Sequence, residues 1–176
     1  MKKEKRRIAQ EAAKLICNGD TIFLDGSTTV QYLIPFLSEK RDLTVITNNM
    51  RLAIELGELD IKVICLGGEI KERPHVLFGD ETVENAMRYH ADKMFFSVAG
   101  NTLDGHIKDT AYRLLYKIML KNSAESYFLT DKTKTEERIG IELCDFSYLT
   151  GVISDFEFPE EIKEIYEGVN FIFAKE

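Results

Sequence analysis

The fold of this protein is decided by the stretch Thr21-Ile22-Phe23-Leu24-Asp25-Gly26-Ser27-Thr28-Thr29. A short apolar run ends in an acidic residue, a small hydroxyl-rich turn follows, and a helical pattern begins at Val30. This order predicts a strand, a tight loop and a helix. Gly26 lets the loop backbone approach a ligand closely, because glycine has no Cβ atom. Free backbone N–H groups at the start of a helix favour negatively charged groups.

The stretch therefore predicts a phosphate or carboxylate site, in which the hydroxyls of Ser27, Thr28 and Thr29 assist the backbone. An ordinary turn, in which Ser or Thr only caps the following helix, is the alternative that the stretch leaves open. The glycine-rich patterns Gly-x-x-x-x-Gly-Lys-Ser/Thr and Gly-x-Gly-x-x-Gly do not occur here, so neither common nucleotide-binding loop is indicated.

The size and composition are those of a globular domain. The chain has 176 residues, of which 44% are hydrophobic and 30% charged, and this is enough for a substantial core. The net charge of -7 argues against a surface that is mainly a nucleic-acid footprint. No apolar run approaches the roughly 18 residues that span a bilayer, so we expect no membrane segment.

Metal and disulfide chemistry are not indicated. Cys17, Cys65 and Cys144 are scattered and odd in number, and the three histidines share no metal-type spacing with them. We therefore expect no metal, no cofactor and no disulfide framework, and a location in a reducing cytoplasm.

Strand patterns alternate with helix patterns through most of the chain. The expected strands cover residues 21–24, 42–49, 61–66, 94–99, 127–131, 148–153 and 169–173. The expected helices cover residues 8–16, 30–37, 50–56, 79–89, 111–124 and 159–166. Alternation of this kind predicts an α/β fold with a mostly parallel sheet and helices on both faces. Pro35 should shorten or kink the second helix. Residues 69–77 are expected to form a loop or ribbon, and residues 101–110 a loop.

Ligands of an open parallel sheet bind at the carboxyl ends of its strands. These ends are expected at residues 25–28, 47–49, 67–68, 100–101, 131–132 and 154–155. Their hydroxyl, amide and acidic side chains suit a sugar-like ligand that carries a phosphate. Asp25, Asp131 and Asn48 could accept from or donate to its hydroxyls. Lys132 and Lys134 could supply the cation, with Lys108 and Arg113 as alternatives. Polar strand ends that simply meet water are the other interpretation.

Several motifs follow one another in an order that resembles a known family. They are Gly19 to Thr29, Val45-Ile46-Thr47-Asn48-Asn49, Leu66-Gly67-Gly68, Leu77-Phe78-Gly79, Ala91-Asp92-Lys93-Met94-Phe95, Gly100 to Gly105, and Leu129 to Lys134. In this order and spacing the chain, from about Arg7 to about Asp155, resembles the effector-sensing domain of DeoR-family transcriptional regulators. The family usually has a glycine where Ser27 stands.

The resemblance implies a ribose-5-phosphate isomerase-like, Rossmann-like fold and a phosphorylated sugar or similar metabolite as ligand. Residues 1–18 would be a linker or leading helix, and residues 19–176 the sensing domain. Matching the family's motifs residue by residue implies a ligand site made of Asp25, Gly26, Ser27, Thr28, Thr29, Thr47, Asn48, Gly68, Asp104, Gly105, Asp131, Lys132 and Lys134.

The resemblance also implies partners. Family members carry a winged helix-turn-helix domain before this region, so DNA would be bound only through a domain that this sequence does not contain. The chain would then be a truncated regulator or a stand-alone sensor. Family members usually form oligomers, so we expect a homo-oligomer.

Two rival functions remain open. A sugar-phosphate isomerase of the same fold would need a carboxylate base, for which Asp25 with Asp131 or Asp104 is available, and a cation such as Lys132. A pure interaction domain with a vestigial pocket is the other rival. The expected function is that of a non-catalytic sensor.

Overall fold

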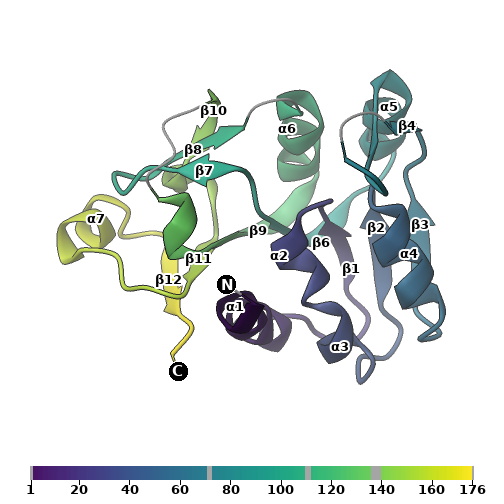
Figure 1. Cartoon of the computed structure of the whole chain (residues 1–176), viewed down its shortest axis with the longest axis horizontal. Helices are drawn as coiled ribbons and strands as arrows, with labels where there is room; N and C mark the ends of the chain where they lie inside the picture. The colour runs from purple at the N-terminus through teal and green to yellow at the C-terminus, as the bar shows by residue number, and fades with distance from the viewer. Residues whose placement is uncertain (1, 71–72, 110–111, 136–139, 176) are drawn as a thin grey trace.

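A seven-stranded sheet runs through the middle of the molecule in the computed structural model (Figure 1). The structure describes residues 2–70, 73–109, 112–135 and 140–175. The strand order is β12-β11-β9-β6-β1-β2-β3, and all neighbouring pairs are parallel. The strands are β1 (Thr21–Leu24), β2 (Thr44–Thr47), β3 (Lys62–Cys65), β6 (Ala91–Phe96), β9 (Ser123–Thr130), β11 (Gly151–Ser154) and β12 (Asn170–Phe173). The predicted α/β fold with a mostly parallel sheet is confirmed.

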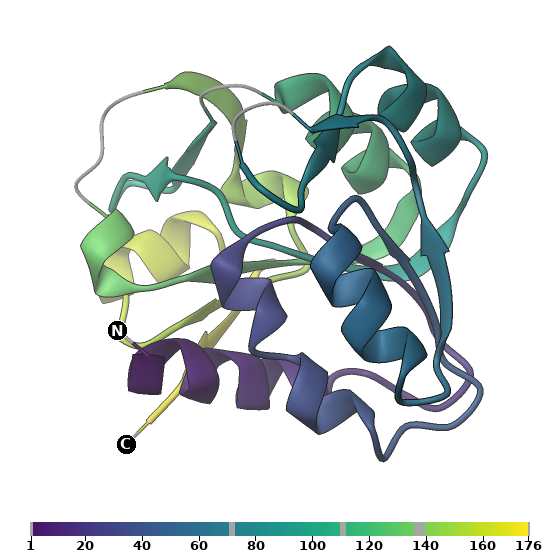
Figure 2. The same ribbon diagram turned by 45° about the vertical axis from the view of Figure 1, so that its right-hand side comes forward.

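Side chains alternate between the two faces of the central strands, and each face is covered by helices. Ile22 and Leu24 of β1 belong to one apolar core, whereas Phe23 between them belongs to the other. Helices α1 to α4 bury residues in the first core and lie together on one side of the sheet (Figure 2). Helices α5 to α7 pack on the second core. The helices are α1 (Lys2–Lys14), α2 (Thr28–Gln31), α3 (Ile34–Leu37), α4 (Met50–Gly57), α5 (Asp80–Met87), α6 (Arg113–Lys121) and α7 (Glu160–Ile165).

Helix α1 is packed into the first core. Its residues Ile8, Ala9, Ala12 and Ala13 are buried, and their spacing forms one apolar stripe of a helix. This stripe contacts β9, β11, α2 and α3. The leading helix therefore contributes to the same core as the sheet. None of the helices in the described ranges has the length and apolar character that a bilayer crossing requires.

A second, three-stranded antiparallel sheet corrects the prediction of a loop over residues 101–110. Its order is β10-β8-β7, and its strands are β7 (Gly100–Asn101), β8 (His106–Asp109) and β10 (Ile141–Asp145). Ile107 and Asp109 are the inward residues of β8. The carboxylate of Asp109 accepts a hydrogen bond of 2.8 Å from the backbone N–H of Tyr112. Because this inward residue is acidic, the sequence does not show the alternation of apolar and polar residues that is typical of a strand. Residue 110 lies outside the described residues.

The described residues of the segment predicted as a loop or ribbon, 69–70 and 73–77, belong to a ribbon. Strands β4 (Glu69–Ile70) and β5 (Leu77–Phe78) pair in antiparallel fashion, and residues 71–72 between them lie outside the described residues. The arm after the gap, residues 73–76, is fastened to the end of β2. The N–H of Met50 donates to the carbonyl of His75 at 2.8 Å, and that of Leu77 to the carbonyl of Asn48 at 2.7 Å.

Some predicted boundaries were wrong. The expected helix over residues 111–124 ends at Lys121, and Ser123 already begins β9, whose start carries polar residues. In place of one helix over residues 30–37 there are two short helices, α2 and α3. Pro35 lies in the first turn of α3, so the predicted shortening or kinking of this helix is confirmed. The expected strand over residues 94–99 ends at Phe96. Short 3₁₀ turns cover Lys132–Lys134 and Phe146–Tyr148.

Candidate functional site

The centre of the sheet contains a topological switch point. After β1 the chain adds β2 and β3 on one side, and it then returns to place β6 on the other side of β1. Open parallel sheets bind ligands at the carboxyl ends of the strands at such a point. A cavity of about 440 Å³, called the loop cavity here, lies there. Its lining residues are Gly26, Ser27, Thr28, Gln31, Arg51, Arg73, Pro74, His75, Val76, Ser97, Val98, Ala99 and Lys134.

The turn after β1 has the geometry of a helix start. Ser27 is the N-cap residue of α2, and its hydroxyl accepts the backbone N–H of Val30 at 3.3 Å. Thr29 is buried, whereas Thr28 is exposed at the loop cavity. A Cβ atom at position 26 would collide with the side chain of Val76. The arm therefore lies directly against Gly26, and the turn requires a glycine there.

Asp25 lies beneath this turn and does not line the loop cavity. Its carboxylate accepts hydrogen bonds from the Ser27 hydroxyl at 2.7 Å, the Tyr116 hydroxyl at 2.7 Å and the Ser97 N–H at 3.4 Å. Burial raises the pKa of Asp25, and these hydrogen bonds act in the opposite direction. Asp25 therefore ties the turn to the end of β6 and to helix α6.

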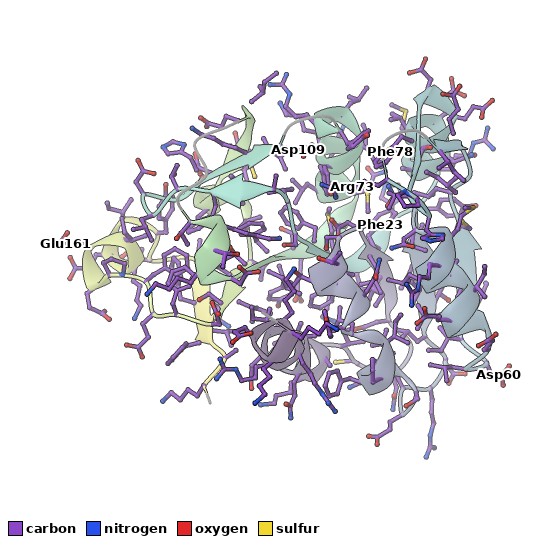
Figure 3. All side chains as sticks on the ribbon, viewed as in Figure 1. Phe23, Asp60, Arg73, Phe78, Asp109 and Glu161 are labelled. Atoms are coloured by element: carbon purple, nitrogen blue, oxygen red, sulfur yellow. The ribbon has the colours of Figure 1, made fainter. Side chains whose placement is uncertain are left out.

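Positively charged side chains approach the loop cavity from three separate segments. The ammonium of Lys134 donates to the Ser97 hydroxyl at 2.7 Å. Burial lowers the pKa of Lys134, while the nearby Asp131 carboxylate raises it. Arg73 comes from the arm (Figure 3), and Arg51 comes from α4, where it pairs with Glu55 at 2.7 Å. A cation cluster beside exposed loop hydroxyls can bind a phosphate or carboxylate.

The predicted residues at the end of β2 hold the arm in place. Thr47 is buried, and its hydroxyl accepts the N–H of Asn49 at 3.1 Å. The buried side-chain amide of Asn48 donates to the carbonyl of Leu77 at 3.0 Å. Neither Thr47 nor Asn48 lines the loop cavity. Both instead stabilise the backbone of the segments that form it.

The two predicted glycines beyond the turn permit close packing. Gly68 has a φ of +119°, and a Cβ atom there would collide with the hydroxyl of Thr82. Gly105 has a φ of +96° and lies against the ring of Tyr166. Both positions favour glycine for two reasons, because the backbone is left-handed and the space is filled.

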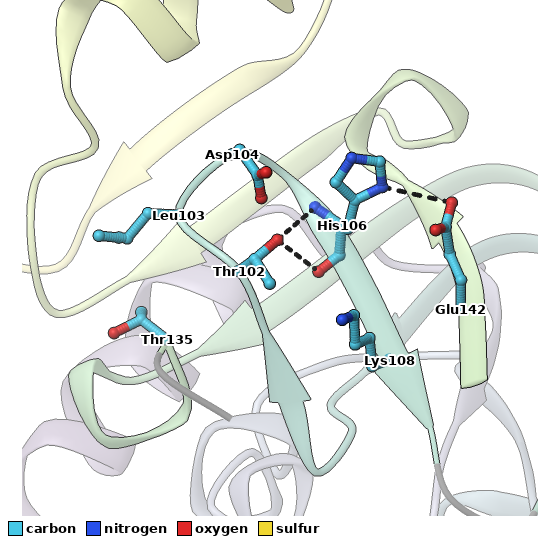
Figure 4. Close-up of a pocket in the computed structure, with 7 residues that line it drawn as sticks. All are labelled: Thr102, Leu103, Asp104, His106, Lys108, Thr135 and Glu142. Atoms are coloured by element: carbon cyan, nitrogen blue, oxygen red, sulfur yellow. Dashed lines mark hydrogen bonds and ion pairs between the residues drawn. The ribbon is translucent and has the colours of Figure 1, made fainter. Parts of the chain in front are cut away.

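Asp104 lines a different cavity, called the sheet cavity, which has a volume of about 770 Å³ (Figure 4). The lining residues are Thr102, Leu103, Asp104, His106, Lys108, Thr135 and Glu142. The Thr102 hydroxyl holds the pKa of Asp104 below its ordinary value, and His106 Nδ1 lies 3.3 Å from Glu142 Oε1. None of the described lining residues is common to both cavities, but Lys134 of one and Thr135 of the other are adjacent in the chain.

Asp131 and Lys132 follow β9, and neither is among the described lining residues of the loop cavity. Asp131 is buried and caps the 3₁₀ turn, accepting the N–H of Thr133 at 3.1 Å. Lys132 is exposed, and its N–H donates to the Asp155 carboxylate at 2.9 Å. Of the predicted site residues, the structure brings Gly26, Ser27, Thr28 and Lys134 together at the loop cavity. Asp25 and Thr29 lie beneath it.

Sequence reasoning missed Arg51, Arg73, His75 and Ser97. Ser97 stands inside an apolar run and was assigned to the strand. Arg73 and His75 lie in a segment with no regular period, so nothing placed them near the turn. The φ of His75 is +77°, which is unusual for a residue other than glycine and often accompanies a functional constraint. Among the described residues, His, Cys, Asp and Glu form no group of three that could hold a metal ion.

Comparisons with known proteins identify relatives. Residues 1–156 match the family described as the DeoR C terminal sensor domain. The chain is 34% identical over 155 residues to the uncharacterized HTH-type transcriptional regulator YulB of Bacillus subtilis (strain 168), covering 86% of this chain and 60% of that protein. It is 34% identical over 170 residues to the lactose phosphotransferase system repressor of Staphylococcus aureus (strain N315), covering 92% of this chain and 66% of the repressor. The chain thus spans three fifths to two thirds of these relatives.

Solved structures with a similar fold belong to other kinds of protein. The ribose 5-phosphate isomerase from Plasmodium falciparum matches with a TM-score of 0.56 and 14% identity, covering 77% of this chain and 53% of that one. The eIF2B delta from Chaetomium thermophilum matches with a TM-score of 0.64 and 19% identity, covering 90% of this chain and 57% of that one. These likenesses establish the shared fold.

Proposed function

Because this chain belongs to the DeoR family as a C-terminal sensor domain, we propose that it binds a phosphorylated sugar or related metabolite in the loop cavity. One observation carries the proposal. The turn Gly26–Thr28, with its exposed hydroxyl, shares a cavity with the cationic side chains of Lys134 and Arg73. Phosphate groups are bound in proteins by this combination of backbone N–H groups, hydroxyls and cations.

The electrostatics support a dianionic ligand. The chain as a whole carries a net charge of -7, yet the described lining of the loop cavity includes Arg51, Arg73 and Lys134 and neither Asp nor Glu. The half-buried ammonium of Lys134, whose pKa is lowered, is stabilised in its charged form when an anion comes beside it. A phosphate in contact with Lys134 and the turn would supply that anion.

The size of the cavity suits a small phosphorylated metabolite. A volume of about 440 Å³ lies in the range of roughly 300–1,000 Å³ that is typical of small-molecule sites. With the phosphate at the turn, the hydroxyls of the sugar would meet Gln31, His75 and Ser97. The sheet cavity, with Asp104 and His106, would serve a longer ligand.

We propose further that ligand binding controls DNA binding by another domain, in a homo-oligomer of the intact regulator. One relative carries the name HTH-type transcriptional regulator and another the name repressor. Control of this kind requires the ligand to bind two arrangements of the regulator with unequal affinity. The DNA-binding partner and the oligomer both belong to this proposal.

Calorimetry tests the proposal directly. The purified chain would be titrated with a panel of pentose, hexose and triose phosphates, with the same sugars lacking the phosphate and with inorganic phosphate. At least one phosphorylated sugar should bind saturably, and its unphosphorylated form should not. Thermal unfolding provides an independent readout, because a ligand at about a hundred times its dissociation constant adds roughly 2.7 kcal/mol of stability.

An enzyme assay separates the sensor from its rival of the same fold. The carboxylates that an isomerase could use are Asp25, Asp104 and Asp131, and none of them is among the described lining residues of the loop cavity. Incubation with ribose 5-phosphate should leave the sugar unchanged. Conversion to its ketose isomer, lost on substitution of Lys134, would make the isomerase the better interpretation.

A further inference from the structure

The side chain of Lys5 on helix α1 contacts Thr28, which lines the loop cavity. In an α-helix, residues three, four and seven positions apart share a face. Lys5 stands in this relation to the buried residues Ile8, Ala9 and Ala12. The packing of α1 on the sheet therefore fixes which way Lys5 points. Lys5 lies about one helical turn before the apolar stripe, and its side chain contacts the loop that follows β1.

The contact is specific. The ammonium of Lys5 donates a hydrogen bond of 2.9 Å to the hydroxyl of Thr28, and Thr28 lines the loop cavity. Lys5 itself is half-buried. Among the described residues, no carboxylate lies within ion-pair distance of its ammonium. Within the described part of the chain, the hydrogen-bond partner of this cation at the turn is therefore a neutral hydroxyl.

The charge of Lys5 acts on the same space as the other cations. The pKa of Lys134 is lowered mainly by burial, and the positive charges of Lys5 and Arg73 lower it further. Three positive groups, from α1, the arm and the 3₁₀ turn after β9, therefore repel one another around the turn. The nearby carboxylates of Asp131 and Asp25 offset part of this repulsion, and a phosphate between the three cations would add further attraction.

We propose that Lys5 is a direct ligand of the effector's phosphate and that the bound phosphate thereby fastens the first turns of α1 to the sheet. This inference rests on the proposed function of the loop cavity. It adds a binding residue from a segment whose sequence suggested only a linker or leading helix. The family describes a C-terminal sensor domain. In a regulator with a domain before it, α1 would connect the two domains, so a change in α1 on ligand binding would be passed on to that domain.

Matched substitutions test the role of Lys5. Lys5→Gln removes the charge at the turn, whereas Lys3→Gln removes the same charge from an exposed position of the same helix. The full chain and both variants would be titrated with inorganic phosphate and with the sugar phosphates of the panel. We expect Lys5→Gln to weaken binding by about ten- to a hundredfold and Lys3→Gln to change it by less than about twofold. Lys5→Arg should restore most of the affinity, and all variants should melt close to the parent.

Hydrogen exchange gives a second readout. Phosphate should slow the exchange of amides in residues 3–8 of the parent chain and of Lys3→Gln, but not of Lys5→Gln. If the parent binds phosphate and Lys5→Gln binds equally well, or if α1 exchanges at the same rate with and without ligand, Lys5 has no such role while the sensor function stands. If the parent binds neither phosphate nor any sugar phosphate, both proposals fail.

Discussion

The hydroxyl of Tyr116 donates a hydrogen bond of 2.7 Å to the carboxylate of Asp25. The two residues come from elements far apart in the chain, because Tyr116 lies on α6 and Asp25 follows β1. The same carboxylate also accepts from Ser27 and Ser97. One buried carboxylate therefore links the turn after β1, the end of β6 and a helix of the second core.

Removing the Tyr116 hydroxyl should destabilise the fold. In Tyr116→Phe the buried carboxylate loses one of its three donors, and a group left short of a partner costs about 1–3 kcal/mol. Urea unfolding would measure the loss. Tyr148→Phe is the matched control, because Tyr148 is 73% exposed, and it should leave the free energy of unfolding within about 0.5 kcal/mol of the parent. Equal stability of the two variants would show that the Tyr116–Asp25 contact contributes nothing.

Gly26 should not tolerate even one additional carbon atom. In Gly26→Ala the new Cβ would meet the side chain of Val76, so the arm must move away from the turn. We expect ligand binding to be lost and the melting temperature to fall. Gly57→Ala is the control, because a Cβ at that position would meet no atom within 4 Å beyond its chain neighbours and the backbone of its own helix. It should be neutral or slightly stabilising, since alanine favours the helix. Unchanged ligand affinity in Gly26→Ala would contradict the close packing of the arm.

Lys134 should contribute to ligand binding but not to folding. Lys134→Met removes a half-buried cation whose pKa is lowered by burial, so the free protein should be as stable as the parent or more stable. Affinity for a sugar phosphate should fall by about tenfold or more, because a hydrogen bond to a charged group contributes about 1.5–3 kcal/mol. Lys132→Met changes an exposed lysine of the same turn and should retain affinity. Calorimetry would measure the affinity of the two variants for the sugar phosphate. Equal affinities would show that Lys134 does not contribute to ligand binding.

Ligand affinity should depend on alkaline pH through the same lysine. The folded-state pKa of Lys134 lies below its ordinary value of 10.5, so its charge costs folding stability below that lowered pKa. The cost is relieved as the pH rises from there toward 10.5. A bound phosphate favours the charged ammonium, so binding takes up a proton and weakens as the pH rises through the lowered pKa.

Titrations from about pH 7.5 upward isolate this dependence, because a phosphate monoester with a second pKa near 6 stays dianionic there. The parent chain should lose affinity steadily with pH, and Lys134→Met should show a flatter dependence. The same slope in both proteins would mean that another group carries the proton.

The strand, turn and helix around Asp25 could be predicted because the signal there is local. The apolar run of β1 stops at an acidic residue, and small hydroxyl residues follow directly. The parallel sheet was predictable for a similar reason, since each strand and helix carries its own period. Lys134 was found because it follows β9 within a few residues.

The rest of the site depends on contacts between distant segments. Ser97 could not be separated from the strand because Phe96 before it and Val98 after it are both apolar and buried. Arg73 reaches the cavity only because the arm is fastened to β2 by Asn48. The small sheet was hidden because Asp109, a buried carboxylate, takes an inward position of β8. Asn48 and Gly68 carry family motifs, yet the structure gives them packing positions.

The central claim is that the turn after β1 binds phosphate, and an amide NMR titration of the chain with the tightest-binding sugar phosphate tests it most directly. The account predicts saturable shifts of the backbone amides of Gly26, Ser27, Thr28 and Ser97 at one common dissociation constant. Shifts confined to the sheet cavity around Asp104 and His106, with the amides of the turn unmoved, would contradict it.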